Sequence, residues 1–326
     1  MNDRLAEPSS DSQIILPAVQ MNVYTPKEPG VGRVVKSELC VASPHKSAGV
    51  VRHIEFDVGG SALAGAGRPG QAFGVLPPGV DANGKAHKVR LYSYASPSFG
   101  EDGGGHVIST CVKRVIDEDW KTHKLFEGVA SNYLCDLQVG EEVKLTGPVG
   151  RRFLLPISAR NFSYIFVATG TGIAPFRAMV MELLRSNATN PIVLIMGVAY
   201  ATDLLYHPYF QELADRHPNF HYLTAVSREM QLDGKGGPMY VHQRIVSHTD
   251  LLLPLLQRDN TLIYICGITG MEVGLFQQFA EHLTPHDLSR YLTVDGEAMH
   301  HVESWTRPMI HREIRTTDRV FLEVYG

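Results

Sequence analysis

The sequence predicts two domains of different class: an antiparallel β-barrel followed by an α/β domain built on a parallel sheet. Short strand-like runs broken by glycine and proline fill the first half of the chain. After about Pro156, longer apolar runs alternate with helical stretches, and a glycine-rich turn follows the first of these runs at 164–168. With 326 residues, the chain is long enough to bury two separate cores.

The barrel is predicted from short strand-like runs with turn chemistry between them. These runs occupy 33–35, 51–56, 73–76, 107–112 and 142–145, and turn residues fill 79–84. Many short strands joined by such turns are typical of an antiparallel barrel. We place this domain at 21–157, and we expect the polar, aperiodic residues 1–20 to form a mobile tail.

Four apolar runs predict the strands of the second domain, which we place at 158–326. They occupy 164–168, 191–197, 220–226 and 261–266, and helical stretches separate them. Strands separated by helices form a parallel sheet with both faces covered. Right-handed crossovers bring the segments after these strands to one edge of the sheet, where we expect a nucleotide to bind.

The glycine-rich turn has the order strand, glycine turn and helix start, and it reads Thr169-Gly170-Thr171-Gly172-Ile173-Ala174-Pro175-Phe176-Arg177. Glycines let the backbone approach phosphate oxygens, and the helix N-terminus offers unpaired N–H groups. Pro175 suits the first helical turn. Because the usual third glycine of a dinucleotide fingerprint is missing, a simple tight turn remains an alternative for this segment alone.

Composition excludes several classes of protein. The net charge of −4 argues against a general nucleic-acid binder. No apolar run reaches the length of a membrane span, and the first twenty residues lack signal-peptide features, so we expect a cytoplasmic protein. The four widely separated cysteines predict reduced thiols and no iron–sulfur cluster, and the fifteen histidines lack ligand spacing, so no metal site is predicted.

A second motif, Arg90-Leu91-Tyr92-Ser93-Tyr94-Ala95-Ser96, alone predicts only a half-buried strand with an exposed arginine. Read with the segments that follow in order, it resembles the flavin-binding segment of plant-type ferredoxin–NADP reductases. The resemblance runs from about Asn22 onward, and it continues through Cys111–Arg114, Gly128–Asp136, Gly147–Gly150, Ala225–Glu229, Cys266–Glu272 and Glu323–Tyr325.

The resemblance implies that the barrel binds FAD. It places Arg90 on the FAD pyrophosphate, Tyr92 against the isoalloxazine and Ser93 close to flavin N5. Ser131 would donate to the pyrophosphate together with nearby backbone N–H groups. The same segments contribute the further cofactor-binding candidates Cys111, Lys113, Val129 and Ala130, where Ala130 stands in place of the family's usual cysteine.

The adenine end of FAD is less well defined by the resemblance. The family commonly has an aromatic residue shortly after the Cys-Val-Lys-Arg segment, and this chain has Asp117 there. Trp120 follows a little later, either as a substitute or as an ordinary loop tryptophan.

The resemblance also implies an NADP(H) site in the second domain. Thr171 and Gly172 belong to the glycine loop, and Ser227 with Arg228 would hold the 2′-phosphate, since an arginine pairs with a phosphate. Tyr240 would stack on the adenine. Pro238 stands where relatives often have a second cation, which weakens the expected preference for NADP.

Four candidate catalytic residues remain: Ser93, Cys266, Glu323 and Tyr325. By resemblance Cys266, which precedes Gly267, touches nicotinamide C4, although a buried structural thiol is the alternative. Glu323 would lie beside it, and the Tyr325 ring would cover the flavin. Gly326 extends the chain past that tyrosine, and residues 300–317 fit the family poorly.

We therefore expect an FAD-dependent ferredoxin(flavodoxin)–NADP⁺ oxidoreductase that exchanges hydride with NADP(H) and single electrons with a carrier protein. Its partner would be ferredoxin or flavodoxin, and the enzyme would be a monomer. The alternatives are the reductase component of an oxygenase, similar to a benzoyl-CoA oxygenase reductase, and a non-catalytic flavin-binding protein. A basic docking face would draw on Lys27, Arg33, Lys36, Lys85, Lys88, Arg151 and Arg152.

Overall fold

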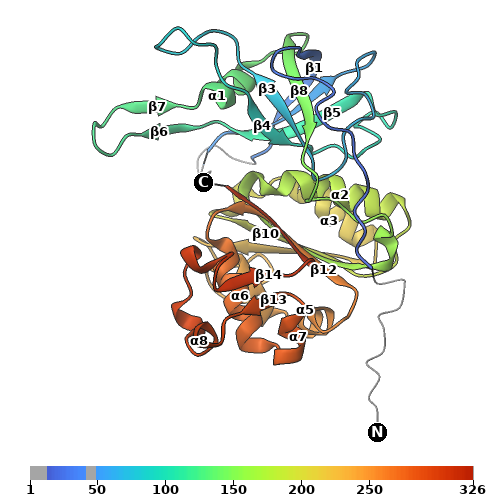
Figure 1. The fold of residues 1–326 in the computed structure, drawn as a ribbon, viewed down its shortest axis with the longest axis vertical. Helices are drawn as coiled ribbons and strands as arrows, with labels where there is room; N and C mark the ends of the chain where they lie inside the picture. Colours follow the sequence, from blue (N-terminus) through green and yellow to red (C-terminus); the bar gives the residue numbers. More distant parts are fainter. Residues whose placement is uncertain (1–12, 42–48, 326) are drawn as a thin grey trace.

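The structure, a computed structural model, describes residues 13–41 and 49–325. Its first domain is a six-stranded antiparallel sheet curled into a barrel (Figure 1). Its strand order is β4-β3-β8-β1-β2-β5. The strands are β1 (Gly30–Leu39), β2 (Val51–Asp57), β3 (Ala72–Leu76), β4 (Arg90–Ser93), β5 (Val107–Lys113) and β8 (Glu142–Val149). Helix α1 (Val129–Asp136) packs against this barrel, and a two-stranded hairpin of β6 (Ile116–Glu118) and β7 (Leu125–Glu127) precedes the helix.

Alternating burial along the strands explains why these residues form a barrel. In β1 buried and exposed residues alternate from Gly30 to Val35, as a strand with one face toward the core requires. The core between the strands is filled by fully buried side chains, among them Ile54, Phe56, Phe73 and Leu145.

The second domain is a five-stranded parallel sheet in the order β11-β10-β9-β12-β15. Its strands are β9 (Ser163–Thr169), β10 (Ile192–Val198), β11 (Phe220–Val226), β12 (Thr261–Ile268) and β15 (Val320–Tyr325). The predicted fold class, a barrel followed by a parallel α/β domain, is confirmed.

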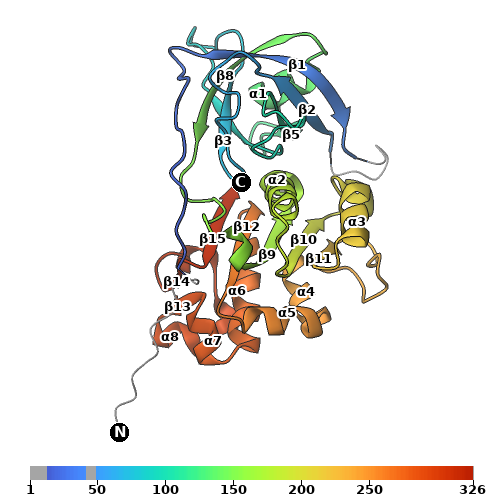
Figure 2. The same ribbon diagram turned by 90° about the vertical axis from the view of Figure 1, so that its right-hand side faces the viewer.

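Helices cover both faces of the parallel sheet (Figure 2). Tyr164 and Phe166 pack toward α2 (Ile173–Arg185) and α3 (His207–Arg216), on the side of the barrel. Ile165 and Val167 point the other way, toward five helices on the opposite face of the sheet. These are α4 (Arg244–Ser247), α5 (Thr249–Leu256), α6 (Met271–His282), α7 (Pro285–Ser289) and α8 (Gly296–Met299). No helix within the described residues is long and apolar enough to cross a membrane.

Residues 300–317, which match the family poorly, form part of a cover over α6. The short strand β14 (Ile314–Thr316) pairs with β13 (Leu292–Val294). The buried Trp305 donates its indole N–H to the Ala298 carbonyl at 2.9 Å, and Gln277 on α6 donates to the Val302 carbonyl at 2.9 Å. The segment therefore has a packing role on the face away from the barrel.

The N-terminal segment runs along both domains (Figure 2). Residues 1–12 of the expected tail lie outside the described residues, whereas 13–20 contact the body of the protein. The Ile15 carbonyl accepts from the Ile157 N–H at 2.8 Å, and the Gln20 carbonyl accepts from the Gln71 side chain at 3.1 Å. We propose that the boundary between the domains lies at 157/158, within the connection from β8 to β9.

A buried ion pair joins the two domains. Arg177, on α2, donates to both carboxylate oxygens of Glu101 in the barrel, at 2.6 and 3.0 Å, and also to the Ala95 carbonyl at 2.8 Å. Each charged side chain is only 12% exposed. The Ser109 hydroxyl donates to the same carboxylate at 2.6 Å. Charge-assisted bonds in this bidentate geometry are among the stronger ones in proteins.

Aromatic rings complete this interdomain cluster. The Arg177 guanidinium lies over the rings of Tyr206 and Tyr209, 5.2 and 5.4 Å from their centroids. The Tyr206 hydroxyl lies 2.9 Å from Nδ1 of His53 on β2, so β2 is also tied to the second domain. Tyr206 adopts a left-handed backbone conformation (φ 57°), which is costly for a bulky residue and is held by these contacts.

We predict that Arg177→Met lowers the free energy of unfolding by about 3–5 kcal/mol, because Glu101 would remain buried without its cation. Urea unfolding measures the change. The matched control is Arg216→Met, which breaks the exposed Arg216–Glu212 pair and should cost about 0–0.5 kcal/mol. Similar losses for the two variants would mean that the interdomain pair has no special role.

Candidate active site

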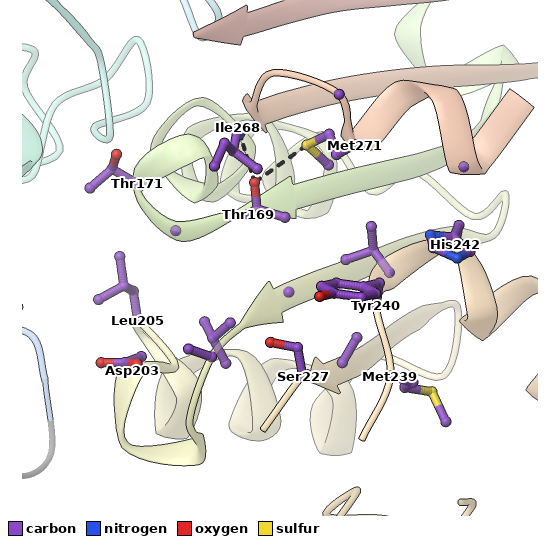
Figure 3. A pocket seen from close by; sticks show the side chains of 18 of the residues that line it. Thr169, Thr171, Asp203, Leu205, Ser227, Met239, Tyr240, His242, Ile268 and Met271 are labelled. Carbon is purple, nitrogen blue, oxygen red and sulfur yellow. Dashed lines mark hydrogen bonds between the residues drawn. The ribbon is translucent and has the colours of Figure 1, made fainter. Parts of the chain in front are cut away.

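A cavity of about 840 Å³ opens at the carboxyl edge of the parallel sheet (Figure 3). Its walls come from the ends of β9, β10, β11 and β12 and from the start of α6, and Lys113 of the barrel closes one side. The predicted site residues that line it are Thr171, Ser227, Tyr240, Tyr325 and Lys113. Nucleotides bind at this edge in open parallel sheets.

The glycine loop forms a single turn, η3 (Gly170–Gly172), before α2 begins. A Cβ atom on Gly172 would lie 2.2 Å from the Cys266 carbonyl oxygen, and one on Gly267 would lie 2.1 Å from Thr169 Oγ1. Both glycines are therefore required for the loop after β9 to pack on the end of β12. The Thr169 hydroxyl accepts from the Ile268 N–H at 2.8 Å, which fixes that contact (Figure 3).

Arg228 is exposed at the end of β11, where it can reach a bound anion. Its Nη1 donates to the Tyr200 hydroxyl at 3.3 Å, and its guanidinium lies 5.5 Å from that ring's centroid. Ser227 lines the cavity nearby. Tyr240 lies across the cavity and is 65% exposed, as a free stacking surface requires (Figure 3).

His242, which the sequence analysis did not select, adds a second ring to the cavity wall. It lies nearly parallel to Tyr240, with centroids 6.0 Å apart and planes at 19° (Figure 3). Burial lowers its pKa, which favours the neutral imidazole near pH 7.

Buried polar residues hold the loop that carries Arg228 and Tyr240. Gln231 accepts from the Val226 N–H at 3.0 Å and donates to the Val226 carbonyl at 2.7 Å. The fully buried Arg244 donates to the Thr224 carbonyl at 2.6 Å and to Asp233 at 2.8 Å. No local pattern in the sequence identifies these residues, because only the folded loop buries them.

The register of β15 against β12 brings two candidate catalytic residues together. Cys266 pairs with Glu323, and Ile268 pairs with Tyr325. Cys266 is 2% exposed, and burial, with Glu323 nearby, raises its thiol pKa well above the usual value, so the thiol stays neutral. Glu323 is an exposed residue, but partial desolvation of its carboxyl group raises its pKa to about 7.

The C-terminal tyrosine contacts the glycine loop. The Tyr325 hydroxyl lies 2.8 Å from Thr171 Oγ1, and 47% of the residue is exposed. Gly326, which follows this tyrosine, lies outside the described residues.

The flavin candidates of the barrel meet the nucleotide loop at β5. The Thr110 hydroxyl donates to the Ser93 carbonyl at 2.8 Å, and the Cys111 thiol donates to the Thr171 carbonyl at 3.5 Å. Cys111 is thus buried between the domains. Tyr92 is half-buried on β4, and burial raises its pKa to about 12, so its hydroxyl stays neutral.

The start of α1 offers donors that suit a pyrophosphate. The Ser131 hydroxyl donates to the Gly128 carbonyl at 3.0 Å and accepts from the Val115 N–H at 3.2 Å, so it supports the turn. The amide groups of Ala130 and Ser131 have no acceptor among the described residues. These free amides and the exposed Arg90 on the same domain supply the donors and the positive charge that suit an anionic dinucleotide, and Val129 is exposed at the same helix start.

We predict that Glu323→Gln makes the free energy of unfolding less dependent on pH. The folded-state pKa of Glu323 lies above the unfolded value, so the unfolded chain loses this proton first. The free energy of unfolding should therefore fall in the wild type, relative to the variant, as the pH rises from about 4.5 to about 7. Thermal unfolding across this window measures it, and parallel curves would contradict the assignment.

Comparisons with known proteins agree with this geometry. A family model described as the oxidoreductase NAD-binding domain matches residues 166–275. The ferredoxin–NADP reductase of Thermosynechococcus vestitus is 38% identical over 312 residues, covering 92% of this chain and 78% of that protein. The leaf-type chloroplastic isozyme of Nicotiana tabacum is 42% identical, covering 79% and 70%.

A solved structure supports the fold independently. The ferredoxin–NADP⁺ reductase from Plasmodium falciparum aligns with a TM-score of 0.68, covering 96% of this chain and 100% of that one at 23% identity. At that identity the likeness concerns the fold alone. The identities above 30% over most of the relatives' length show that this chain belongs to the ferredoxin–NADP reductase family.

Proposed function

We propose that this protein is an FAD-dependent ferredoxin–NADP⁺ oxidoreductase. The observation that supports the proposal is that the barrel contacts the glycine loop beside the nucleotide cavity. Cys111 of the barrel bonds to Thr171 of the glycine loop, and Thr171 in turn contacts Tyr325. A flavin held on the barrel and a nicotinamide held on the parallel sheet would therefore face each other at this contact between the domains, which we call the seam.

The residues of the barrel fit FAD by their chemistry. Arg90 supplies a cation and the start of α1 supplies free amides for the pyrophosphate, while Tyr92 supplies a flat surface for the ring. When bound, FAD exchanges two electrons with a nicotinamide as hydride and passes them singly to a carrier. Ser93 ends β4 at the seam, where its hydroxyl can hold a proton beside the ring.

The residues of the second domain orient the nicotinamide nucleotide. Arg228 and Ser227 would hold the 2′-phosphate, and Tyr240 would stack on the adenine. The neutral Cys266 thiol provides a small, uncharged contact at the nicotinamide end and does not repel a hydride. Glu323, with a pKa of about 7, can hold or release a proton there. The Tyr325 ring must move aside as nicotinamide enters.

We infer that the electron carrier is ferredoxin, the partner named in the relatives, and that flavodoxin serves as an alternative carrier. We further propose that the enzyme acts as a cytoplasmic monomer. Of the basic residues considered for docking, Arg33 pairs with Glu142 at 3.0 Å and Lys36 with Glu38 at 3.1 Å. The exposed Arg151 and Arg152 beside the C-terminal end of β8 are better placed to meet an acidic carrier.

The test is whether the purified protein is yellow, retains FAD, and reduces ferredoxin and flavodoxin with NADPH. Arg90→Ala should release FAD more readily, while the far-UV circular dichroism remains that of the wild type. A folded wild-type protein that binds no FAD, or a flavoprotein that oxidises NADPH but reduces neither carrier, would contradict the proposal.

We predict that Arg228→Ala raises KM for NADPH roughly tenfold and leaves KM for NADH almost unchanged, because only NADPH carries the 2′-phosphate. Pro238 stands where relatives often have a second cation, so we expect the effect of Arg228 to be modest. Steady-state kinetics with both cofactors measures it. Arg216→Ala, at a distant exposed arginine, is the control, and equal losses for NADPH and NADH would assign Arg228 a structural role.

A further inference from the structure

The hairpin of β6 and β7 leaves unusually many apolar side chains in solvent. Ile116, Trp120, Leu125 and Phe126 are 55%, 84%, 77% and 57% exposed. Every residue of both strands is exposed, so neither face of the hairpin packs on the barrel. The hairpin stands away from the domain beside α1 (Figure 1). Large exposed apolar surface of this kind marks a place where a ligand or partner binds.

The base of the hairpin is tied to the proposed pyrophosphate site. The Val115 N–H donates to Ser131 Oγ at 3.2 Å, and the Val115 carbonyl accepts from the Gly128 N–H at 2.9 Å and from Asn132 Nδ2 at 2.9 Å. These bonds fix the strands where α1 begins. On the proposed function, the flavin ring lies at the seam with Tyr325, so the adenosine half of FAD extends beyond the pyrophosphate toward this hairpin.

The pairing of β6 with β7 shows which aromatic ring lies on the same face of the hairpin as Asp117. Asp117 pairs directly with Phe126, and their neighbours in each strand point to the opposite face. Directly opposite residues of an antiparallel pair project from the same face, with Cβ atoms about 4.5–5.5 Å apart. Asp117 is the position at which the resembling family has an aromatic residue. Phe126 therefore presents a ring on that same face from the partner strand.

We propose that Phe126 is the platform on which the adenine of FAD stacks. The family has its aromatic residue on the strand that corresponds to β6, whereas this chain has one on β7, on the same face of the hairpin. Asp117 does not obstruct it, since its carboxylate turns back and accepts from the Glu118 N–H at 2.8 Å. This inference rests on the proposed function, because it requires FAD in the barrel site.

Two neighbouring residues are less suited to the role. Leu125 lies on the opposite face, paired with Glu118, and has no ring. Trp120 lies in the turn beyond the last strand pair, which the Asp119 N–H closes by donating to the Lys124 carbonyl at 2.9 Å. No strand pairing fixes which way its ring faces, whereas the register fixes the face of Phe126.

The test compares FAD with FMN, which lacks the adenosine half. The full-length chain, stripped of flavin, is titrated with each, and flavin fluorescence reports binding. Phe126→Ala should weaken FAD binding on the order of tenfold, as expected for loss of one base–aromatic stack, and leave FMN binding unchanged. Leu125→Ala, on the other face of the same strand, is the matched control and should change neither.

A rescue variant separates stacking from general damage to the hairpin. Asp117→Tyr in the Phe126→Ala background restores a ring to the same face and should recover FAD affinity. The proposal is overturned if Phe126→Ala behaves like Leu125→Ala, if Trp120→Ala alone produces the FAD-specific loss, or if FAD and FMN weaken equally. A wild-type chain that binds neither flavin would instead refute the proposed function itself.

Discussion

The ion pair between Arg177 and Glu101 sets the geometry on which the other features depend. Arg177 lies on α2, the helix that starts at the glycine loop, so the pair attaches the nucleotide-binding element directly to the barrel. Both charges are buried, and each would be costly without its partner. The same interface places Cys111 of the barrel against Thr171 of the loop.

Within the second domain the site depends on backbone contact at the ends of β9 and β12. Gly172 and Gly267 have no side chains, and any Cβ there would overlap the neighbouring strand. The glycine loop, expected to serve phosphate approach, thus also serves packing. Because β15 pairs with β12, the position of β12 places Glu323 beside Cys266. The same pairing places Tyr325 beside the glycine loop.

Three departures from the family pattern have different structural consequences. Ala130 is buried at the start of α1, and its backbone N–H has no acceptor among the described residues. Pro238 removes a cation, but the loop around it keeps its shape through Gln231 and Arg244. Asp117 removes a ring from one strand of the hairpin, and Phe126 returns one from the other.

The fold class, the glycine loop and the family can be read from the sequence, because each rests on short segments whose residues are close together in the chain. Burial patterns along strands and the turn after β9 follow from local chemistry, and the structure agrees with them. Which distant groups meet depends on how the chain folds in three dimensions. Arg177 and Glu101 are separated by 76 positions, and Cys266 meets Glu323 through strand register. Such pairings follow from domain packing and sheet register, which no local pattern specifies.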